Sequence, residues 1–162
     1  MAISDIYTFS SGSVTIATVS GTALLSVVMP TTVRGWVVGV RFKIGNTGAL
    51  AGNNMLFQLC RPANTPTGTT TTAGVAHDFS APAGLATGYT AWSTAPTLGV
   101  LLHPGWELPM TSGTEAVEYP PTNYEWGIPA IANGSANNGV HVFVTASVNT
   151  STPVFVDLMV SV

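Results

Sequence analysis

The chain has 162 residues, and only 7% of them are Asp, Glu, Lys or Arg, against about 25% in an average soluble domain. The net charge of -3, with four basic residues, excludes a nucleic-acid partner, whose phosphates require clustered Lys and Arg. So few charges do little to keep copies of a chain apart, and the composition is therefore typical of a protein packed against other subunits.

The N-terminal residues predict neither a signal peptide nor a membrane partner. Residues 1–7 have no basic region followed by a long apolar run. The apolar stretch at residues 22–29 is too short to cross a bilayer. We expect residues 1–12 to form a short N-terminal arm, whose apolar side chains add a strand to a neighbouring subunit.

Apolar residues alternate with small or polar ones along most of the chain, which is the period of a half-buried strand. In the longest such stretch, residues 33–44, the even-numbered residues from Trp36 to Ile44 are apolar. This register places Trp36 in the core and Arg41 on the opposite face, either in solvent or in an ion pair. The other strands are predicted at residues 14–18, 24–29, 55–60, 75–79, 98–102, 142–148 and 154–162.

Two stretches lack this alternation and predict long connections. Residues 61–73 contain a run of threonines, which favours either an exposed loop or an edge strand in an oligomer. Residues 102–129 contain five prolines and predict a functional loop, because long loops in compact domains usually bind something. The turn signal at residues 137–139 predicts a hairpin between residues 126–132 and the strand at Val140.

These elements predict a single domain, residues 1–162, of the all-β class. About eight strands with long crossing connections and no helical periodicity indicate an antiparallel β-sandwich. A jelly roll is the leading topology, because its two Greek keys use eight strands. An immunoglobulin-like sandwich is the alternative, although the Cys-Trp-Cys framework of that fold is absent.

Acidic and aromatic residues gather between residues 106 and 126. The carboxylates are Glu107, Glu115, Glu118 and Glu125, and the rings are Trp106, Tyr119, Tyr124 and Trp126. Paired carboxylates suit glycoside hydrolysis, and the rings suit stacking on sugars. We favour a third interpretation, in which the carboxylates are solvated and the four aromatic residues contact a protein partner.

No constellation of residues predicts an enzyme, a metal site or a cofactor. The spacings of His77, His103 and His141 match no local zinc motif. The chain also contains no nucleophile elbow and no phosphate-binding loop. The single cysteine, Cys60, lies in an apolar run, which predicts a buried and inert thiol.

Residues 121–129, Pro-Thr-Asn-Tyr-Glu-Trp-Gly-Ile-Pro, and the Gly- and Asn-rich residues 130–139 resemble small β-structured virion proteins of tailed bacteriophages. Residues 92–97 and the last predicted strand fit the same pattern. That family includes capsid decoration, or cement, proteins. The resemblance implies a jelly roll that assembles as a homotrimer on the major capsid protein, without catalytic residues. Such a chain is made in the host cytoplasm and resides on the capsid surface of the virion.

Two functional expectations follow from these observations. The first is a structural protein that binds the outer surface of a phage capsid as an oligomer and decorates or cements it. The alternative is a carbohydrate-binding or receptor-binding module of a phage tail or fibre, with a glycan as its partner. Exposure of the four rings in one shallow patch favours the alternative, whereas their burial favours the structural role.

Overall fold

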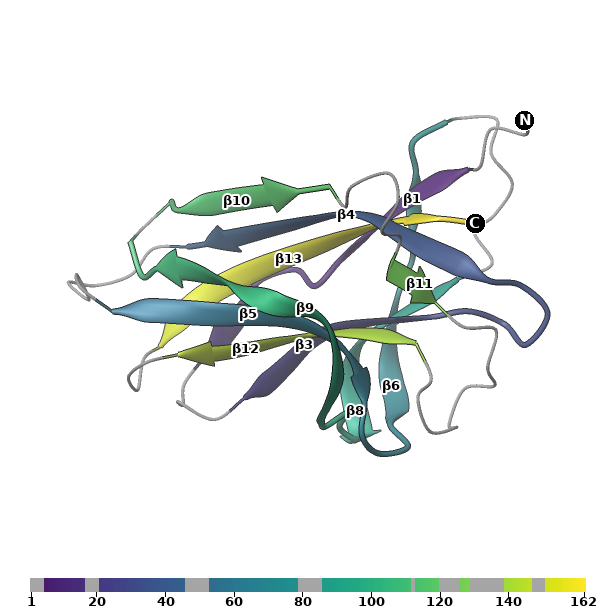
Figure 1. Ribbon diagram of the computed structural model, residues 1–162, viewed down its shortest axis with the longest axis horizontal. Helices are drawn as coiled ribbons and strands as arrows, with labels where there is room; N and C mark the ends of the chain where they lie inside the picture. Colours follow the sequence, from purple (N-terminus) through teal and green to yellow (C-terminus); the bar gives the residue numbers. More distant parts are fainter. Residues whose placement is uncertain are drawn as a thin grey trace.

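The structure, a computed structural model, describes residues 5–16, 21–45, 53–78, 86–111, 113–119, 126–128, 139–146 and 151–162. Within these ranges every regular element is a β-strand (Figure 1). The strands form two antiparallel sheets that pack face to face, which confirms the predicted all-β sandwich. Both the jelly roll and the immunoglobulin-like alternative are sandwiches of this kind. The described residues contain no helix long and apolar enough to cross a membrane.

Sheet A and sheet B are the two layers of the sandwich. Sheet A has the order β10 (Glu115–Glu118), β4 (Gly35–Ile44), β13 (Thr152–Ser161), β1 (Ile6–Ser10) and β7 (Val75–Ala76). In addition, β11 (Trp126–Ile128) pairs with β4, and β2 (Val14–Ile16) pairs with β13. Sheet B has the order β6 (Thr67–Thr72), β8 (Thr87–Thr94), β3 (Thr22–Val28), β12 (Val140–Ala146), β5 (Asn54–Pro62) and β9 (Leu98–Pro109).

The core lies between the sheets and is built from alternate residues of the long central strands. Sheet A contributes Phe42 from β4 and Leu158 from β13, and sheet B contributes Phe57 from β5, all at most 1% exposed. The ring centroids of Phe42 and Phe57 are 4.6 Å apart, so these two side chains join the layers directly. Burial of each such side chain contributes roughly 1.5–3 kcal/mol, which is why the alternating pattern determines which face of a strand turns inward.

The longest predicted strand is confirmed as β4, but in its first half the prediction of which face turns inward is wrong. Val40, Phe42 and Ile44 are buried, as predicted. Trp36, which was expected in the core, is only half-buried, and its neighbour Val37 is fully buried instead.

A β-bulge explains this change of face. The pairing of β13 with β4 shifts between Met159 and Val160, which lie opposite Gly39 and Val37. The residue between those two on β4, Val38, is therefore the extra residue of the bulge. One extra residue exchanges the two faces of a strand, so the alternation read from the second half of β4 does not continue into the first half.

The predicted N-terminal arm, residues 1–12, is built into sheet A where the structure describes it. Strand β1 lies between β13 and β7, with Tyr7 opposite Val160. Phe9 is fully buried. The strand expected to be added to a neighbouring subunit is therefore paired, over residues 6–10, within this chain's own sheet, and Tyr7 and Phe9 pack into its core. Residues 1–4 lie outside the described residues.

The prediction of a long loop at residues 102–129 is wrong where the structure describes them. Strand β9 extends to Pro109, and β10 and β11 follow within the same stretch. Prolines are compatible with β9 because it is an edge strand of sheet B, where a missing N–H need not break a ladder bond. The predicted hairpin to Val140 is also wrong, because β11 belongs to sheet A and β12 to sheet B.

The threonine run forms β6, whose edge position in sheet B matches one of the two predicted alternatives. The segment β5–β6 pairs along its length with β8–β9, so the four strands make one long two-stranded ribbon. At its middle, the Ala63 N–H donates to the Thr97 C=O at 3.0 Å. One end of the ribbon joins β12 and the other joins β3. Sheet B therefore curls, and Figure 1 shows β6 and β8 lying across the direction of β5.

Candidate functional site

Of the four predicted partner-contact residues, the structure brings two together, Trp106 on β9 and Trp126 on β11. Their rings meet edge to face, with centroids 5.7 Å apart, between sheet B and sheet A. The Trp106 ring also lies 4.9 Å from that of Phe42 and so extends the core. Trp126 is buried. Both rings therefore contact this chain's own residues.

Polar side chains complete the group. Glu118 on β10 accepts a hydrogen bond from Nε1 of Trp106, and the His103 ring stacks on Trp106 with centroids 4.0 Å apart. The Gly105 N–H donates to Nδ1 of His103 at 3.1 Å. The neutral imidazole therefore carries its proton on Nε2, which lies 3.8 Å from Oε1 of Glu118. His103, Trp106, Glu118 and Trp126, the edge cluster, join the two sheets beside β10.

The other two predicted contact residues do not belong to the edge cluster. Tyr119 directly follows Glu118 in the chain and so points to the opposite face, where it is 65% exposed. Tyr124 lies outside the described residues. The predicted rings therefore do not form one exposed patch, and of the three that the structure describes, only Tyr119 is largely exposed to a partner.

The four glutamates are also not gathered at one place. Glu115 and Glu118 lie on opposite faces of β10, and Glu107 accepts a hydrogen bond from Nδ2 of Asn54 at 2.8 Å. Glu125 lies outside the described residues. Glycoside hydrolysis needs two carboxylates on either side of one bond, and the three described glutamates do not provide that arrangement.

The three histidines lie on separate elements. Nε2 of His77, next to β7, is 2.6 Å from Oγ1 of Thr8, whereas His103 is part of the edge cluster and His141 lies on β12. In the part of the chain that the structure describes, no three His, Cys, Asp or Glu side chains are grouped so as to hold a metal ion.

A buried polar row, which sequence reasoning missed, crosses sheet B. His141 lies between Ser26 on β3, to which it is hydrogen-bonded, and Cys60 on β5. All three residues are at most 1% exposed, so no substrate reaches the thiol. Burial raises the pKa of the Cys60 thiol, and a backbone hydrogen bond with Gly99 lowers it by a smaller amount. The prediction of a buried cysteine is confirmed, and its thiol is a poor nucleophile in this state.

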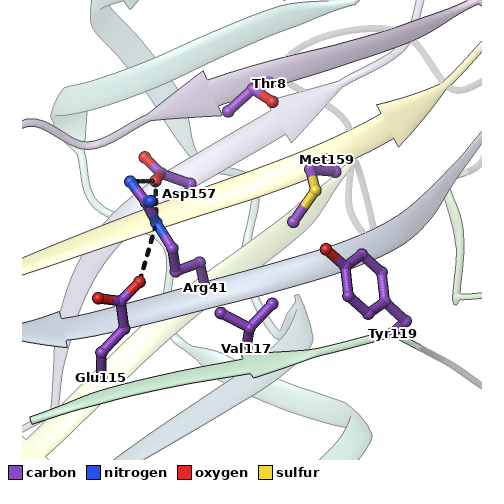
Figure 2. Close-up of a pocket in the computed structure, with 7 residues that line it drawn as sticks. All are labelled: Thr8, Arg41, Glu115, Val117, Tyr119, Asp157 and Met159. Atoms are coloured by element: carbon purple, nitrogen blue, oxygen red, sulfur yellow. Dashed lines mark hydrogen bonds and ion pairs between the residues drawn. The ribbon is translucent and has the colours of Figure 1, made fainter. Parts of the chain in front are cut away.

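A pocket on the outer face of sheet A was also missed by sequence reasoning (Figure 2). Its volume is about 340 Å³. Strands β1, β13 and β4 form its floor, and β10 forms its wall. We refer to it as the sheet-A pocket, and it is lined by Thr8, Arg41, Glu115, Val117, Tyr119, Asp157 and Met159.

Arg41 stands in the sheet-A pocket between two carboxylates (Figure 2). Its Nε and Nη2 donate to Oδ2 of Asp157 at 2.8 and 2.5 Å, and its Nε lies 3.7 Å from Oε1 of Glu115. This triad links three neighbouring strands and confirms the ion pair expected as one alternative for Arg41. The alternation placed Arg41 outward, but only the pairing of β4 with β13, remote in sequence, places Asp157 opposite it.

No protein-family model matches this chain, and no curated protein matches it at a significant level. The function is therefore argued from the geometry and composition of the chain itself.

Proposed function

We propose that the chain is a structural protein of a tailed-phage virion, which binds the outer surface of the capsid as an oligomer, a trimer in the simplest case. In this role it decorates or cements the capsid and carries out no reaction. The major capsid protein is its partner. The phage origin rests on the resemblance of residues 121–139, and the binding role rests on the surface of β9.

The exposed apolar edge of strand β9 is the observation that supports the binding role. It is an edge strand of sheet B, and its first half exposes Leu98, Val100 and Leu101, with Val100 at 64% exposure. An edge strand that presents apolar side chains and open backbone groups pairs readily with another chain, and stable proteins usually cover such an edge. A neighbouring copy that packs a different part of its surface against this edge would cover the apolar side chains, and such a head-to-tail contact closes as a ring of three.

The scarcity of charge supports the same role. With only 7% charged residues, few like charges oppose close contact between copies. Each square ångström of apolar surface removed from water contributes roughly 25 cal/mol to association. An oligomer that engages several capsid subunits at once gains further affinity from the high effective concentration of its second and third contacts.

The alternative, a carbohydrate- or receptor-binding module built on the four predicted rings, receives less support. Trp126 is buried, and Trp106 is engaged by Phe42, His103 and Glu118. Two of the rings thus have partners within the chain. Their arrangement favours the structural role by the criterion of ring burial.

Light scattering of the purified protein at micromolar concentration tests the oligomer. We expect a mass three times that of the protomer. Val100→Lys places a charge on the exposed β9 edge and is expected to yield folded monomers, with a melting temperature lowered by the loss of association. Val75→Lys is the matched control, because Val75 is 69% exposed on β7 of sheet A. A wild-type protein that is monomeric both alone and on the particle contradicts the proposal.

A further inference from the structure

We infer that the sheet-A pocket binds a single neutral saccharide unit, either a free sugar or one residue of a glycan chain. This inference goes beyond the proposed capsid-binding role and does not depend on it, because the pocket lies on the outer face of sheet A, whereas the role rests on the edge of sheet B. It also differs from the predicted glycan site, since Trp106 and Trp126 do not line the pocket.

The first argument is the shape of the pocket. Its volume of about 340 Å³ lies at the lower end of the range of small-ligand sites, roughly 300–1,000 Å³. It is open to solvent along the outer face of the sheet, so a sugar ring within a longer glycan can enter sideways. A site of this size accommodates one sugar ring, so we expect weak binding, in the millimolar range for a monosaccharide.

The second argument is the aromatic wall. Tyr119 is 65% exposed, yet its position is determined by its neighbours. A Cβ atom added at Gly39 would lie only 3.0 Å from Cδ1 and Cε1 of Tyr119 and 2.8 Å from Cε of Met159. The ring therefore rests on the bare backbone of β4, and Figure 2 shows it standing beside the floor of the pocket. The apolar C–H face of a sugar packs well against such a preorganised ring.

The third argument is the polar floor. Both short contacts from Arg41 go to Oδ2 of Asp157. The second oxygen, Oδ1, points away from Arg41 in Figure 2 and receives no hydrogen bond from the described residues. The Asp157 side chain is only 12% exposed, and an acceptor this buried requires a donor, either water or a ligand.

The two groups together match the chemistry of a sugar. A guanidinium has five N–H donors, and Arg41 uses only part of this set on Asp157 and Glu115. The floor thus presents a free acceptor beside free donors. Adjacent hydroxyls of a sugar both donate and accept, and hydrogen bonds to charged groups are about twice as strong as those between neutral groups.

The charge of the pocket determines the class of saccharide. Two carboxylates surround one guanidinium, and Lys43 lies opposite Glu115 on the same face of β4, so the two negative and two positive charges balance. This face therefore has no net positive charge that would select phosphorylated, sulfated or uronic-acid sugars. A cationic side chain from a protein partner is less suited, because Arg41 already occupies the carboxylates that such a group would need.

The test is an NMR titration of the intact ¹⁵N-labelled protein with glucose, galactose, mannose, N-acetylglucosamine and their disaccharides. At least one of these neutral probes is expected to shift the amide signals of Gly39, Tyr119 and Asp157. The shift is expected to be insensitive to salt, because the ligand is uncharged. Arginine amide is the cationic probe, and glucuronic acid is the anionic one.

Two substitutions at one exposed position test the role of the ring. Tyr119→Ala is expected to weaken binding at least about tenfold, whereas Tyr119→Phe keeps the ring and most of the affinity. Thr70→Ala, at an exposed position of β6 in sheet B, is the control and is expected to bind as the wild type does. The melting temperatures of all three variants are measured to establish that the fold is retained.

Three outcomes overturn the inference. The first is that none of the neutral sugars shifts these signals. The second is that a folded Tyr119→Ala variant binds the sugar as tightly as the wild type does. The third is that arginine amide binds in the pocket more tightly than every sugar, in a salt-sensitive way, which indicates a cationic protein partner. None of these results affects the proposed capsid role, which is tested separately by the oligomeric state and by the copy number on the particle.

Discussion

At the scale of single residues, Trp36 and Val37 illustrate what alternation can and cannot predict. The pattern correctly identifies Val40, Phe42 and Ile44 as core residues, because each is apolar in a regular stretch of strand. It misplaces Trp36, because residues 36–38 are Trp, Val and Val. In three successive apolar residues, the extra residue of a bulge cannot be recognised from the sequence. Either register of that triplet would bury an apolar side chain, so only the partner strand distinguishes them.

Phe42 and Trp36 therefore differ in their expected effect on stability. Phe42→Ala removes a ring that contacts Phe57 and Trp106, and it is expected to lower the free energy of unfolding by about 3–5 kcal/mol. Trp36→Ala is expected to cost clearly less, because its side chain is only half-buried. Urea denaturation of the two variants provides the comparison. A larger loss for Trp36→Ala would contradict the observed register of β4.

At the scale of elements, strands with regular alternation could be predicted from the sequence, and strands shaped by bulges could not. Strand β13 was predicted almost in full, because its residues alternate from Val154 to Val160. Strand β9 was recognised only at its beginning, since Pro104, Gly105 and Pro109 resemble loop signals. These residues are tolerated because β9 lies at an edge and its register with β5 shifts several times.

Substitution of Gly105 tests this interpretation of β9. The φ of Gly105 is 128°, and an added Cβ would lie 2.9 Å from the carbonyl oxygen of Phe57. We expect Gly105→Ala to lower stability by about 1–3 kcal/mol and to disturb the hydrogen bond to His103.

Gly113 provides the control for that substitution. It also has a positive φ, 78°, but an added Cβ would meet nothing within 4 Å. The loss of stability in Gly113→Ala therefore measures only the cost of placing Ala at a positive φ, about 1–2 kcal/mol or less. Thermal melts of both variants separate the two effects. An equal loss of stability would show that the close approach of β9 to β5 at Gly105 contributes nothing.

At the scale of the whole molecule, composition and periodicity together were sufficient for the fold class. A turn-rich chain with few charges and no helical periodicity has few architectures other than a sandwich in which to bury its apolar faces. The sites depend on pairings that are remote in sequence, such as Arg41 with Asp157 and Trp106 with Trp126. No local pattern encodes these pairings, so neither the edge cluster nor the sheet-A pocket could be predicted.

We propose that the molecule as a whole serves by binding, as one of many copies on a phage head. Its exposed apolar edge on β9 and its scarcity of charge both suit a chain that is covered by neighbours in an assembly. A decoration protein must be present on the particle in numbers comparable with the subunits that it covers, whereas a tail or fibre module is present in a few copies.

Quantitative mass spectrometry of purified virions from the proposed phage source of this chain tests that claim most directly. The measured quantity is the copy number of the chain relative to the major capsid protein. We expect a ratio of the same order as one, in a multiple compatible with trimers on the head surface. Absence of the chain from the particles, or only a few copies in each, would contradict the account.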